Sequence, residues 1–289
     1  MNLKEVLQNA KENSIALGHF NISDSNQFNG IINVAKTLNV PVIVGVSEGE
    51  KKFIGIHNAV ALVRSARREG LDVFLNLDHA HSVDDCKEAI DAGFDSVMFD
   101  GSKLSFEENI ARTREVVEYA KSFGEKTGKI VLVEGELGYI GSSSKMLDEI
   151  PEDAGLEKTT AEQAREFVKK TEIDILAPSV GNLHGMLKGA TNPDLDIERI
   201  KKISEALPHT FLVLHGGSGI KDDEFKKAIE AGINIVHINT EIRKAYRSGI
   251  ENGLQNDTEQ IAPYKYLNFG REELEKVVLD RIKLFYGAE

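Results

Sequence analysis

The sequence has almost no cysteine, no excess of basic residues and no long apolar run, and each of these absences excludes a class of protein. The single cysteine among 289 residues, Cys86, cannot form an internal disulfide, so we expect a cytoplasmic protein. No apolar stretch approaches the roughly 20 residues of a membrane-spanning helix, and the amino-terminal segment lacks the apolar core of a signal peptide. Acidic residues outnumber basic ones by 47 to 35, and the net charge of −12 argues against a nucleic-acid partner.

The rest of the composition is that of an ordinary globular protein. Hydrophobic residues make up 41% of the chain and charged residues 28%, which excludes a disordered or fibrous protein. The length fits either two average domains or one α/β barrel of about 250 residues. Because no stretch rich in proline, glycine or serine separates two halves, we expect one domain over residues 1–289.

Short β-branched runs alternate with longer runs of helical period along the whole chain. We expect eight strands, at Ile15–Phe20, Val40–Val46, Val73–Leu77, Ser96–Phe99, Ile130–Val133, Ile173–Ala177, Phe211–Leu214 and Ile233–Ile238. Helical patterns follow them at Gln27–Leu38, Asn58–Glu69, Ser82–Ala92, Phe106–Ser122, Ala161–Lys170, Asp196–Ala206, Asp222–Ala231 and Glu241–Gly253. Two further helices flank this series, at Leu3–Asn13 and Arg271–Tyr286.

The strand–helix alternation favours parallel pairing, and the uninterrupted apolar runs indicate strands that are buried on both faces. Eight such units predict an α/β fold, a single (β/α)8 TIM barrel with extra N- and C-terminal helices. A doubly wound open sheet uses the same local units. It is the weaker alternative because no glycine-rich dinucleotide fingerprint follows the first expected strand.

Three of the eight histidines follow expected strands. His79 comes after the third strand, His184 lies beyond the sixth, and His215 follows the seventh. Because the strand ends of a barrel converge in space, these imidazoles are candidate metal ligands, and three of them without nearby thiolates suit Zn²⁺ with an open fourth position. Each histidine alone is equally explained as a hydrogen-bonded polar residue at a strand end.

Glycines and small polar residues follow the seventh and eighth expected strands. Gly216, Gly217 and Ser218 come directly after His215, and His237 precedes Asn239 and Thr240, again at the start of a helix. Glycine lets the backbone N–H groups approach an anion, and a helix start adds a positive dipole end. The loops after strands seven and eight are the usual phosphate site of a barrel, although a plain tight turn would look the same.

Carboxylates also occur at the expected strand ends. Asp78 adjoins His79 and could orient it or act as a general acid or base. Asp100 and Glu136 end the fourth and fifth strands, where a buried carboxylate needs a cation or an ion pair. A metal ion and an internal ion pair with Lys103 or Lys188 both satisfy that requirement.

Five segments carry a resemblance to one enzyme family. They are PVIVGVSEGEKKFIG (41–55), LNLDHAHSVDDCKEAIDAGFDSVMFDGSKLSFEENI (75–110), VEGELGYIG (133–141), GNLHGMLKG (181–189) and LVLHGGSGI (212–220). Their order along nearly the whole chain resembles the class II, metal-dependent ketose-bisphosphate aldolases, which act on fructose 1,6-bisphosphate or tagatose 1,6-bisphosphate.

The resemblance implies an enzyme with defined site residues. It implies Zn²⁺ held by His79, His184 and His215, with Asp78 as the catalytic acid/base. It implies contacts to dihydroxyacetone phosphate, and the matching residues are Gly185, Lys188, Gly216, Gly217, Ser218, Asn239 and Thr240, with Ser47 near the triose. Asp100 and Glu136 match carboxylates of a displaced or second metal position.

The same resemblance implies partners and a reaction. A monovalent cation, Na⁺ or K⁺, near the phosphate and a homodimer or homotetramer are implied. The expected reaction is reversible cleavage of a ketose 1,6-bisphosphate, first of all fructose 1,6-bisphosphate, to dihydroxyacetone phosphate and glyceraldehyde 3-phosphate. Tagatose 1,6-bisphosphate, or another aldehyde partner, stays open. So do a metal-dependent hydrolase and a barrel that binds triose phosphate without turnover.

The chain departs from the family pattern at three places. Ser144 stands where a mobile-loop glutamate is thought to move the proton at C3, and Glu149 or Glu152 could replace it. His237 stands where the family usually has an asparagine that contacts the triose, and its ring could donate a hydrogen bond, carry a proton or point away. The arginine that often holds the distal phosphate is missing. The candidate replacements are Arg243, Arg247 and Lys265.

Overall fold

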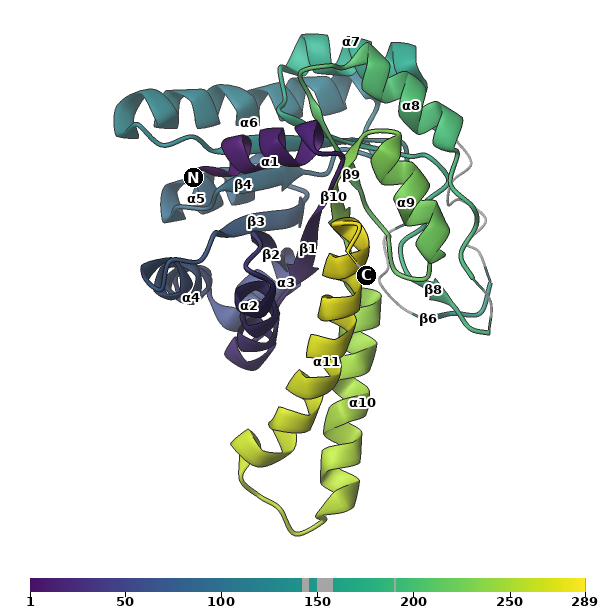
Figure 1. Cartoon of the computed structure of the whole chain (residues 1–289). Coiled ribbons are helices and arrows are strands. Elements are labelled where there is room, and N and C mark those ends of the chain that lie inside the picture. The colour runs from purple at the N-terminus through teal and green to yellow at the C-terminus, as the bar shows by residue number, and fades with distance from the viewer. Residues whose placement is uncertain (142–145, 150–157, 190, 289) are drawn as a thin grey trace.

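The computed structural model describes residues 1–141, 146–149, 158–189 and 191–288. Eight parallel strands close into a barrel in the order β1-β10-β9-β7-β5-β4-β3-β2 (Figure 1). The barrel strands are β1 (Leu17–Asn21), β2 (Val42–Ser47), β3 (Val73–Ala80), β4 (Ser96–Phe99), β5 (Leu132–Leu137), β7 (Ile175–Pro178), β9 (Phe211–Leu214) and β10 (Ile233–His237). The predicted (β/α)8 barrel is therefore confirmed.

Helices surround the barrel and follow its strands. They are α1 (Leu3–Glu12), α2 (Ser25–Leu38), α3 (Glu48–Ile54), α4 (Ile56–Arg68), α5 (Val83–Ala92), α6 (Phe106–Thr127), α7 (Ala161–Thr171), α8 (Ile197–Ala206), α9 (Asp222–Glu230), α10 (Thr240–Asn256) and α11 (Pro263–Phe285). A small ladder joins β6 (Met146–Leu147) to β8 (Met186–Leu187) in parallel. No helix within these described ranges is long and apolar enough to cross a membrane.

Two hydrophobic layers hold the barrel together. One lies inside the barrel at the end where the strands begin, which we call the barrel floor. There Leu17 and Phe74 pack with Leu3 and Leu7 of α1, so this helix covers the floor. The other lies between the strands and the outer helices. Burial of each large apolar side chain contributes about 1.5–3 kcal/mol. The opposite end, where the strands finish, is the barrel mouth, and it carries polar residues.

Local capping residues begin several helices where the sequence places them. Ser82 accepts a hydrogen bond from the backbone N–H of Asp85 at the start of α5. Thr160 and Gln163 form a reciprocal capping box at the start of α7. Gly93 ends α5 in the left-handed conformation, with φ of 103°.

Some strands have other ends than predicted: β5 covers Leu132–Leu137 instead of Ile130–Val133, and β3 ends at Ala80 instead of Leu77. Three further elements differ more from the sequence prediction. Helix α3 was not expected, because its seven residues include only two large apolar side chains, the adjacent Phe53 and Ile54, which form no apolar stripe. Helix α11 begins at Pro263 rather than Arg271, since proline starts a helix well but the first turns carry no buried face. The β6–β8 ladder has two residues in each strand, too few for a periodic pattern.

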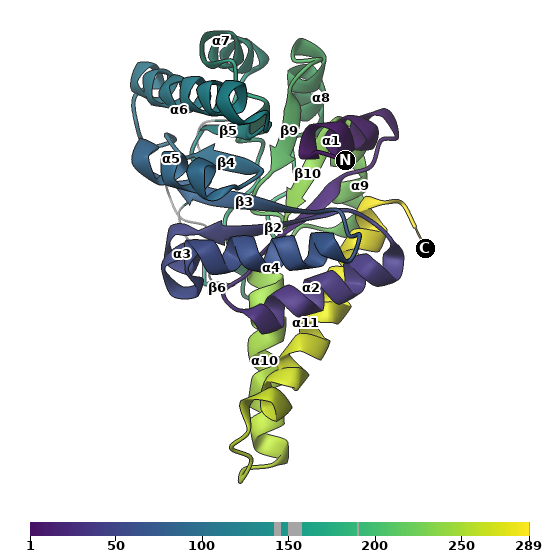
Figure 2. The same cartoon turned by 90° about the vertical axis from the view of Figure 1, so that its left-hand side faces the viewer.

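Helices α10 and α11 form a long antiparallel hairpin that projects from the barrel in both views (Figures 1 and 2). The two helices approach closely at Gly249, where an added Cβ would lie 2.3 Å from the carbonyl oxygen of Phe269. The tip of the hairpin exposes Ile261 and Tyr264, which are 89% and 75% exposed. Helix α10 begins at the barrel mouth, so the hairpin links its exposed apolar tip to the site described next.

Candidate functional site

An irregularity in β3 brings two consecutive side chains, Asp78 and His79, to the same site. Successive residues of a regular strand point to opposite faces. Here the register between β3 and β4 shifts between Leu77 and Ala80, and His79 has a left-handed φ of 49°. Such a conformation is uncommon for a residue other than glycine and is found most often at functional sites. Because of this irregularity, both side chains lie at the barrel mouth.

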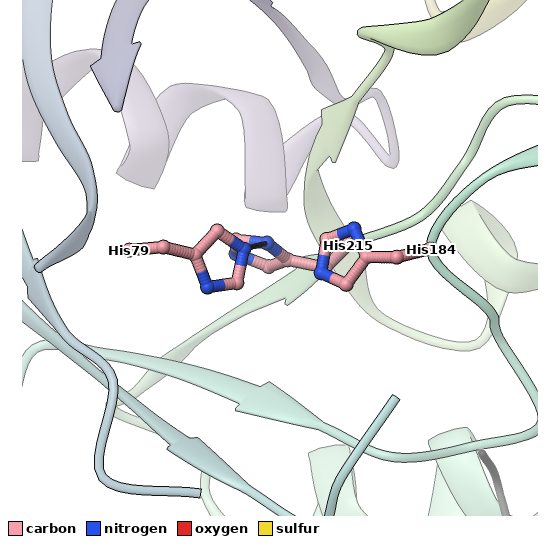
Figure 3. Close-up of side chains that lie close together, drawn as sticks. All are labelled: His79, His184 and His215. Atoms are coloured by element: carbon pink, nitrogen blue, oxygen red, sulfur yellow. Dashed lines mark hydrogen bonds between the residues drawn. The ribbon is translucent and has the colours of Figure 1, made fainter. Parts of the chain in front are cut away.

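Three imidazoles converge at the mouth from different parts of the chain (Figure 3). Nδ1 of His215 lies 3.0 Å from Nε2 of His79, and Nε2 of His184 is buried with no hydrogen-bond partner from any described residue. One nitrogen from each ring lies within 4.8 Å of the others. Two nitrogens on one tetrahedral zinc ion lie about 3.3 Å apart, so the donor set fits Zn²⁺.

Two of these rings are oriented by carboxylates. Nδ1 of His79 lies 2.9 Å from Asp100, and Nε2 of His215 lies 2.6 Å from Glu134. In each case the carboxylate accepts from one ring nitrogen and leaves the other facing the cluster. This is the usual outer arrangement of metal-binding histidines.

Four carboxylates crowd this region, and their electrostatics favour a cation. Burial and the neighbouring charge of Asp78 raise the pKa of Glu134 to about 8. Burial and Asp100 raise the pKa of Glu136 well above its ordinary value. One oxygen of Glu136 has no hydrogen-bond partner. His79, Asp100 and Glu136 also form a candidate ligand group of their own.

The lysine ion pairs considered for Asp100 and Glu136 do not form among the described residues. Lys188 pairs with Asp148 at 2.8 Å, and Lys103 lies over the ring of Tyr139. Asp100 instead accepts hydrogen bonds from the hydroxyl of Ser102 and from His79.

Asp78 is held by one oxygen and left free at the other. Asn21 donates to its Oδ2 at 2.8 Å. Oδ1 is buried, has no hydrogen-bond partner within the described part of the chain and lies 3.4 Å from Nδ1 of His237. Burial opposes ionisation, but the imidazoles of His79 and His237 outweigh it and hold the pKa of Asp78 well below its ordinary value. Asp78 is therefore a carboxylate with one oxygen available for proton transfer.

A polar network extends from Asp78 to the rim of the mouth. The amide of Asn21 also donates to Glu50 at 2.8 Å, and Glu50 accepts from Arg243 at 2.6 Å and from Ser47. Ser47 and Glu50 close a capping box at the start of α3. The unexpected helix thus carries part of the site.

Close backbone approach explains the glycine loop after β9. Gly216 has a φ of 62°, and an added Cβ would lie 2.4 Å from the carbonyl oxygen of Leu183. The amide of Asn192 donates to the carbonyl oxygens of Gly185 and Ser218, which joins this loop to the segment that carries His184. At the start of α10, Asn239 forms no side-chain cap and instead accepts from the backbone N–H of Asn21.

Two neighbouring cavities collect the predicted site residues. A cavity of about 370 Å³ is lined by Asn21, Ser47, Glu48, Gly49, Asp78, His79, His81, Asp100, Lys103, Tyr139, Gly141, His184, Asn239 and Arg243. A smaller one, of about 10 Å³, is lined by His184, Gly185, Gly216, Ser218, His237, Asn239 and Thr240. The ring of His237 therefore faces the site, and the alternative that it points away is wrong.

Several expected residues lie elsewhere. Lys188 is half-exposed in its pair with Asp148 and lines neither cavity. Gly217 and Glu136 are buried and line neither cavity. Ser144 and Glu152 fall outside the described residues, and Glu149 is exposed.

Three residues that bond directly to predicted site residues were not predicted from the sequence: Asn21, Glu134 and Glu50. Asn21 is the last residue of β1, and His79 and Glu136 are each one residue from the end of their strands, so the position of Asn21 was a usable signal. Glu134 lies two residues before Glu136 on β5 and therefore shares its face. The spacing of Ser47 and Glu50 is that of a capping box and could have indicated the start of α3. The contacts of Glu50 with Asn21 and Arg243 gave no signal, because those residues come from distant segments.

Comparisons with known proteins agree with this geometry. The family described as "Fructose-bisphosphate aldolase class-II" matches residues 1–289. A fructose-bisphosphate aldolase of Staphylococcus aureus (strain Mu50 / ATCC 700699) is 40% identical, and the alignment covers 99% of this chain and 96% of the relative. One from Geobacillus stearothermophilus is 35% identical with the same coverage. The crystal structure of the YdjI aldolase from Escherichia coli K12 superposes with a TM-score of 0.80 at 28% identity, covering 98% of this chain and 96% of that one.

Proposed function

The chain belongs to the class II fructose-bisphosphate aldolase family, and on that premise we propose that it cleaves fructose 1,6-bisphosphate reversibly to dihydroxyacetone phosphate and glyceraldehyde 3-phosphate. The observation that carries the proposal is the convergence of three imidazoles beside a carboxylate with one free oxygen. The names of the curated relatives favour fructose 1,6-bisphosphate over the tagatose isomer.

The class II family is zinc-dependent, and we assign the ion to His79, His184 and His215. An ion held there would supply Lewis-acid chemistry, polarising the ketose carbonyl at C2 and stabilising the negative charge that develops as the C3–C4 bond breaks. Asp100 and Glu134 hold two of the rings in the orientation this requires. Asp100 and Glu136, with His79, offer a second metal position.

Asp78 acts as the acid/base of the proposed reaction. During cleavage its free oxygen takes the proton of the C4 hydroxyl, and during synthesis it returns that proton to the aldehyde oxygen. Asn21 fixes the carboxylate by donating to its other oxygen. His237 donates to or accepts from the triose portion at the boundary between the two cavities.

The phosphate of the triose portion would bind at the glycine loop and the start of α10. Gly185, Gly216, Ser218, Asn239 and Thr240, which line the small cavity, supply backbone and hydroxyl groups there, and the dipole of α10 favours an anion. Gly217 shapes the loop, since its own N–H donates to the carbonyl oxygen of His237. Binding energy at this end orients the reacting bond. Ser47 contacts the triose, Lys188 leaves Asp148 to join the phosphate, and a monovalent cation (Na⁺ or K⁺) completes the site.

We assign the distal phosphate to Arg243. Of the three candidate cations, only Arg243 lines the large cavity. Arg247 is 82% exposed and pairs with Glu251, and Lys265 is exposed on α11. Arg243→Met should raise KM for fructose 1,6-bisphosphate about 10- to 100-fold, the value of hydrogen bonds to a charged group.

Arg247→Met is the matched control for that variant. It removes the same charge four residues further along α10, and KM should stay within twofold of the wild-type value. Fructose 1-phosphate has no distal phosphate, so its KM should change little in either variant. Equal KM values for Arg243→Met and the wild type would refute the assignment.

A homodimer or homotetramer is also proposed. The exposed apolar tip of the α10–α11 hairpin, with Ile261 and Tyr264, supports it, because isolated domains seldom expose such side chains together. Sedimentation equilibrium measures the mass, and a monomer at micromolar concentration would refute this proposal.

The overall test is release of dihydroxyacetone phosphate by zinc-loaded protein. Fructose 1,6-bisphosphate, tagatose 1,6-bisphosphate and fructose 1-phosphate are compared, each with and without a chelator. Chelator-sensitive release that is fastest from fructose 1,6-bisphosphate supports the proposal. Faster release from the tagatose isomer or the monophosphate would reassign the substrate, and phosphate release without aldehyde formation would indicate a hydrolase.

A further inference from the structure

A second histidine lies beside His237 and lines neither cavity. His19 on β1 is the register partner of His237 on β10, and its side chain is 1% exposed. The two rings stack with their centroids 3.5 Å apart and 1° between their planes. On the side toward the mouth, the ring of His237 contacts the ring of His215, and the two centroids lie 3.9 Å apart.

The barrel provides a slot for the ring of His19. An added Cβ at Gly45 on β2 would lie 2.3 Å from Cε1 of His19 and 2.6 Å from its Nε2. Any larger residue at that position would push the ring out of the stack. The ring is therefore confined between β2 on one side and His237 on the other.

Hydrogen bonds fix the tautomer of His19 as well as its place. The hydroxyl of Ser96 donates to Oδ1 of Asn76 at 2.9 Å, which turns the NH₂ group of that amide toward Nε2 of His19 at 3.1 Å. An amide NH₂ can only donate, so Nε2 accepts and the ring hydrogen sits on Nδ1. Burial lowers the pKa of His19 to about 4, which keeps the ring neutral.

Three buried atoms near this stack have no hydrogen-bond partner among the residues that the structure describes: Nδ1 of His19, Nδ1 of His237 and Oδ1 of Asp78. The three residues also form a group close enough to bind a metal ion. A shared ion is excluded by the stack, because an imidazole binds a metal in the plane of its ring and two parallel planes 3.5 Å apart share no point. The arrangement is instead that of a support for Asp78 and His237.

We propose that His19 is a positioning residue for the aldol reaction, which holds the ring of His237 so that its Nδ1 faces Asp78 and its edge faces the substrate. His19 touches no reacting atom and acts through the stack. The inference rests on the proposed aldolase function, since Asp78 and His237 are its targets. Without the stack, the ring of His237 is free to turn about its Cβ–Cγ bond.

Kinetics of three variants test this proposal. His19→Ala removes the stack, and Asn76→Leu removes the donor that fixes the tautomer. His19→Phe keeps a flat ring without nitrogen. We expect His19→Ala to lower kcat about 100-fold, the effect of a misplacement of about 1 Å, while KM changes less than threefold. His19→Phe should recover at least tenfold of that loss, and Asn76→Leu should lie between.

Leu17→Ala is the matched control. Leu17 lies two residues earlier on β1, points to the same face and is equally buried in the barrel floor. It should lower the unfolding temperature at least as much as His19→Ala, yet leave kcat within twofold of the wild-type value. Bound zinc should be equal in all variants.

Ring ¹⁵N NMR gives a readout that does not depend on turnover. In the wild type we expect the Nδ1–H tautomer for His19, and in His19→Ala we expect His237 to lose its single ring state. If kcat and the His237 signals are unchanged in His19→Ala, or if kcat falls equally in Leu17→Ala, the proposal is wrong. If the wild type cleaves no ketose bisphosphate, the proposed function fails, and the NMR signals still decide whether His19 fixes His237.

Discussion

At the scale of single residues, the irregularity of β3 determines which side chains can react. Asp78 has a free oxygen in the site, while its other oxygen is held by Asn21. Asp78→Asn keeps the shape of the side chain but cannot accept a proton. We expect kcat to fall by about 10²- to 10⁴-fold, the usual contribution of general acid–base catalysis, with unchanged zinc content.

Asp84→Asn is the control for that variant. Asp84 is exposed in the first turn of α5, five residues beyond His79, and takes no part in the site. Its kcat should equal that of the wild type. A kcat for Asp78→Asn within tenfold of the wild-type value would assign the proton transfer to another group.

A second prediction at the scale of residues concerns Gly216 in the loop after β9. Gly216→Ala adds a Cβ 2.4 Å from a carbonyl oxygen and also strains a left-handed φ. We expect a loss of about 2–5 kcal/mol of unfolding free energy, from strain of about 1–2 and a steric overlap of about 1–3 kcal/mol. The affinity for dihydroxyacetone phosphate should fall as well. Denaturant unfolding and calorimetric titration measure the two effects.

Gly128→Ala separates strain from overlap. Gly128 has a similar φ of 72°, but an added Cβ there meets nothing within 4 Å. It should lose only the strain term, about 1–2 kcal/mol, and should bind the triose phosphate normally. Equal losses in the two variants would show that the overlap at Gly216 is relieved by a small backbone shift.

At the scale of elements, α3 is anchored to α5 by a buried lysine. Lys51, whose side chain is 8% exposed, pairs with Asp85 at 2.5 Å and with Glu88 at 2.7 Å. Burial alone would lower the pKa of Lys51, but its hydrogen bonds raise it above 10.5. Hydrogen bonds from Lys51 and Ser82 lower the pKa of Asp85 below 3.8.

From these two pKa shifts we expect the ion pair of Lys51 and Asp85 to stabilise the fold only within a limited pH range. Asp85 loses its share as pH falls through its lowered pKa, and Lys51 loses its share as pH rises through its raised pKa. Lys51→Met should therefore cost about 1–2 kcal/mol, discounted for the partial exposure of the carboxylates, between about pH 4 and 10. Urea unfolding across this range should show the two curves converging at both ends, and a constant difference would contradict the assignment.

The elements also show why some features could be predicted from the sequence and others could not. The strands carry uninterrupted apolar runs, and Asp78, His79 and His215 directly follow them, so position along the chain was enough. Helix α3 has no apolar stripe. His19 lies within an expected strand and gave no signal, because its meaning depends on His237, which is 218 residues away.

At the scale of the whole molecule, the barrel concentrates negative charge around its mouth. Zinc should therefore stabilise the folded chain as well as activate it. At a hundredfold excess over its dissociation constant, a ligand adds about 2.7 kcal/mol, which corresponds to a rise of roughly 5 °C in the unfolding temperature. Scanning calorimetry after chelation and after zinc addition measures this rise.

His184→Ala should abolish the zinc-induced rise, because it removes one of three ligands. Magnesium is the control ion, since it prefers oxygen ligands and octahedral geometry, and it should shift the transition little. An equal shift with both ions would place the metal on the carboxylates instead of the imidazoles.

Strand β1 and helix α11 meet at the barrel floor, at the opposite end from the mouth. The carbonyl oxygen of Phe285 accepts from the backbone N–H of Ala16 just before β1, and α1 covers the same end. An attachment at either terminus is therefore directed away from the mouth. A protein immobilised on a support through its final residues would present its open face to the flowing solution, which is the orientation that a flow reactor needs.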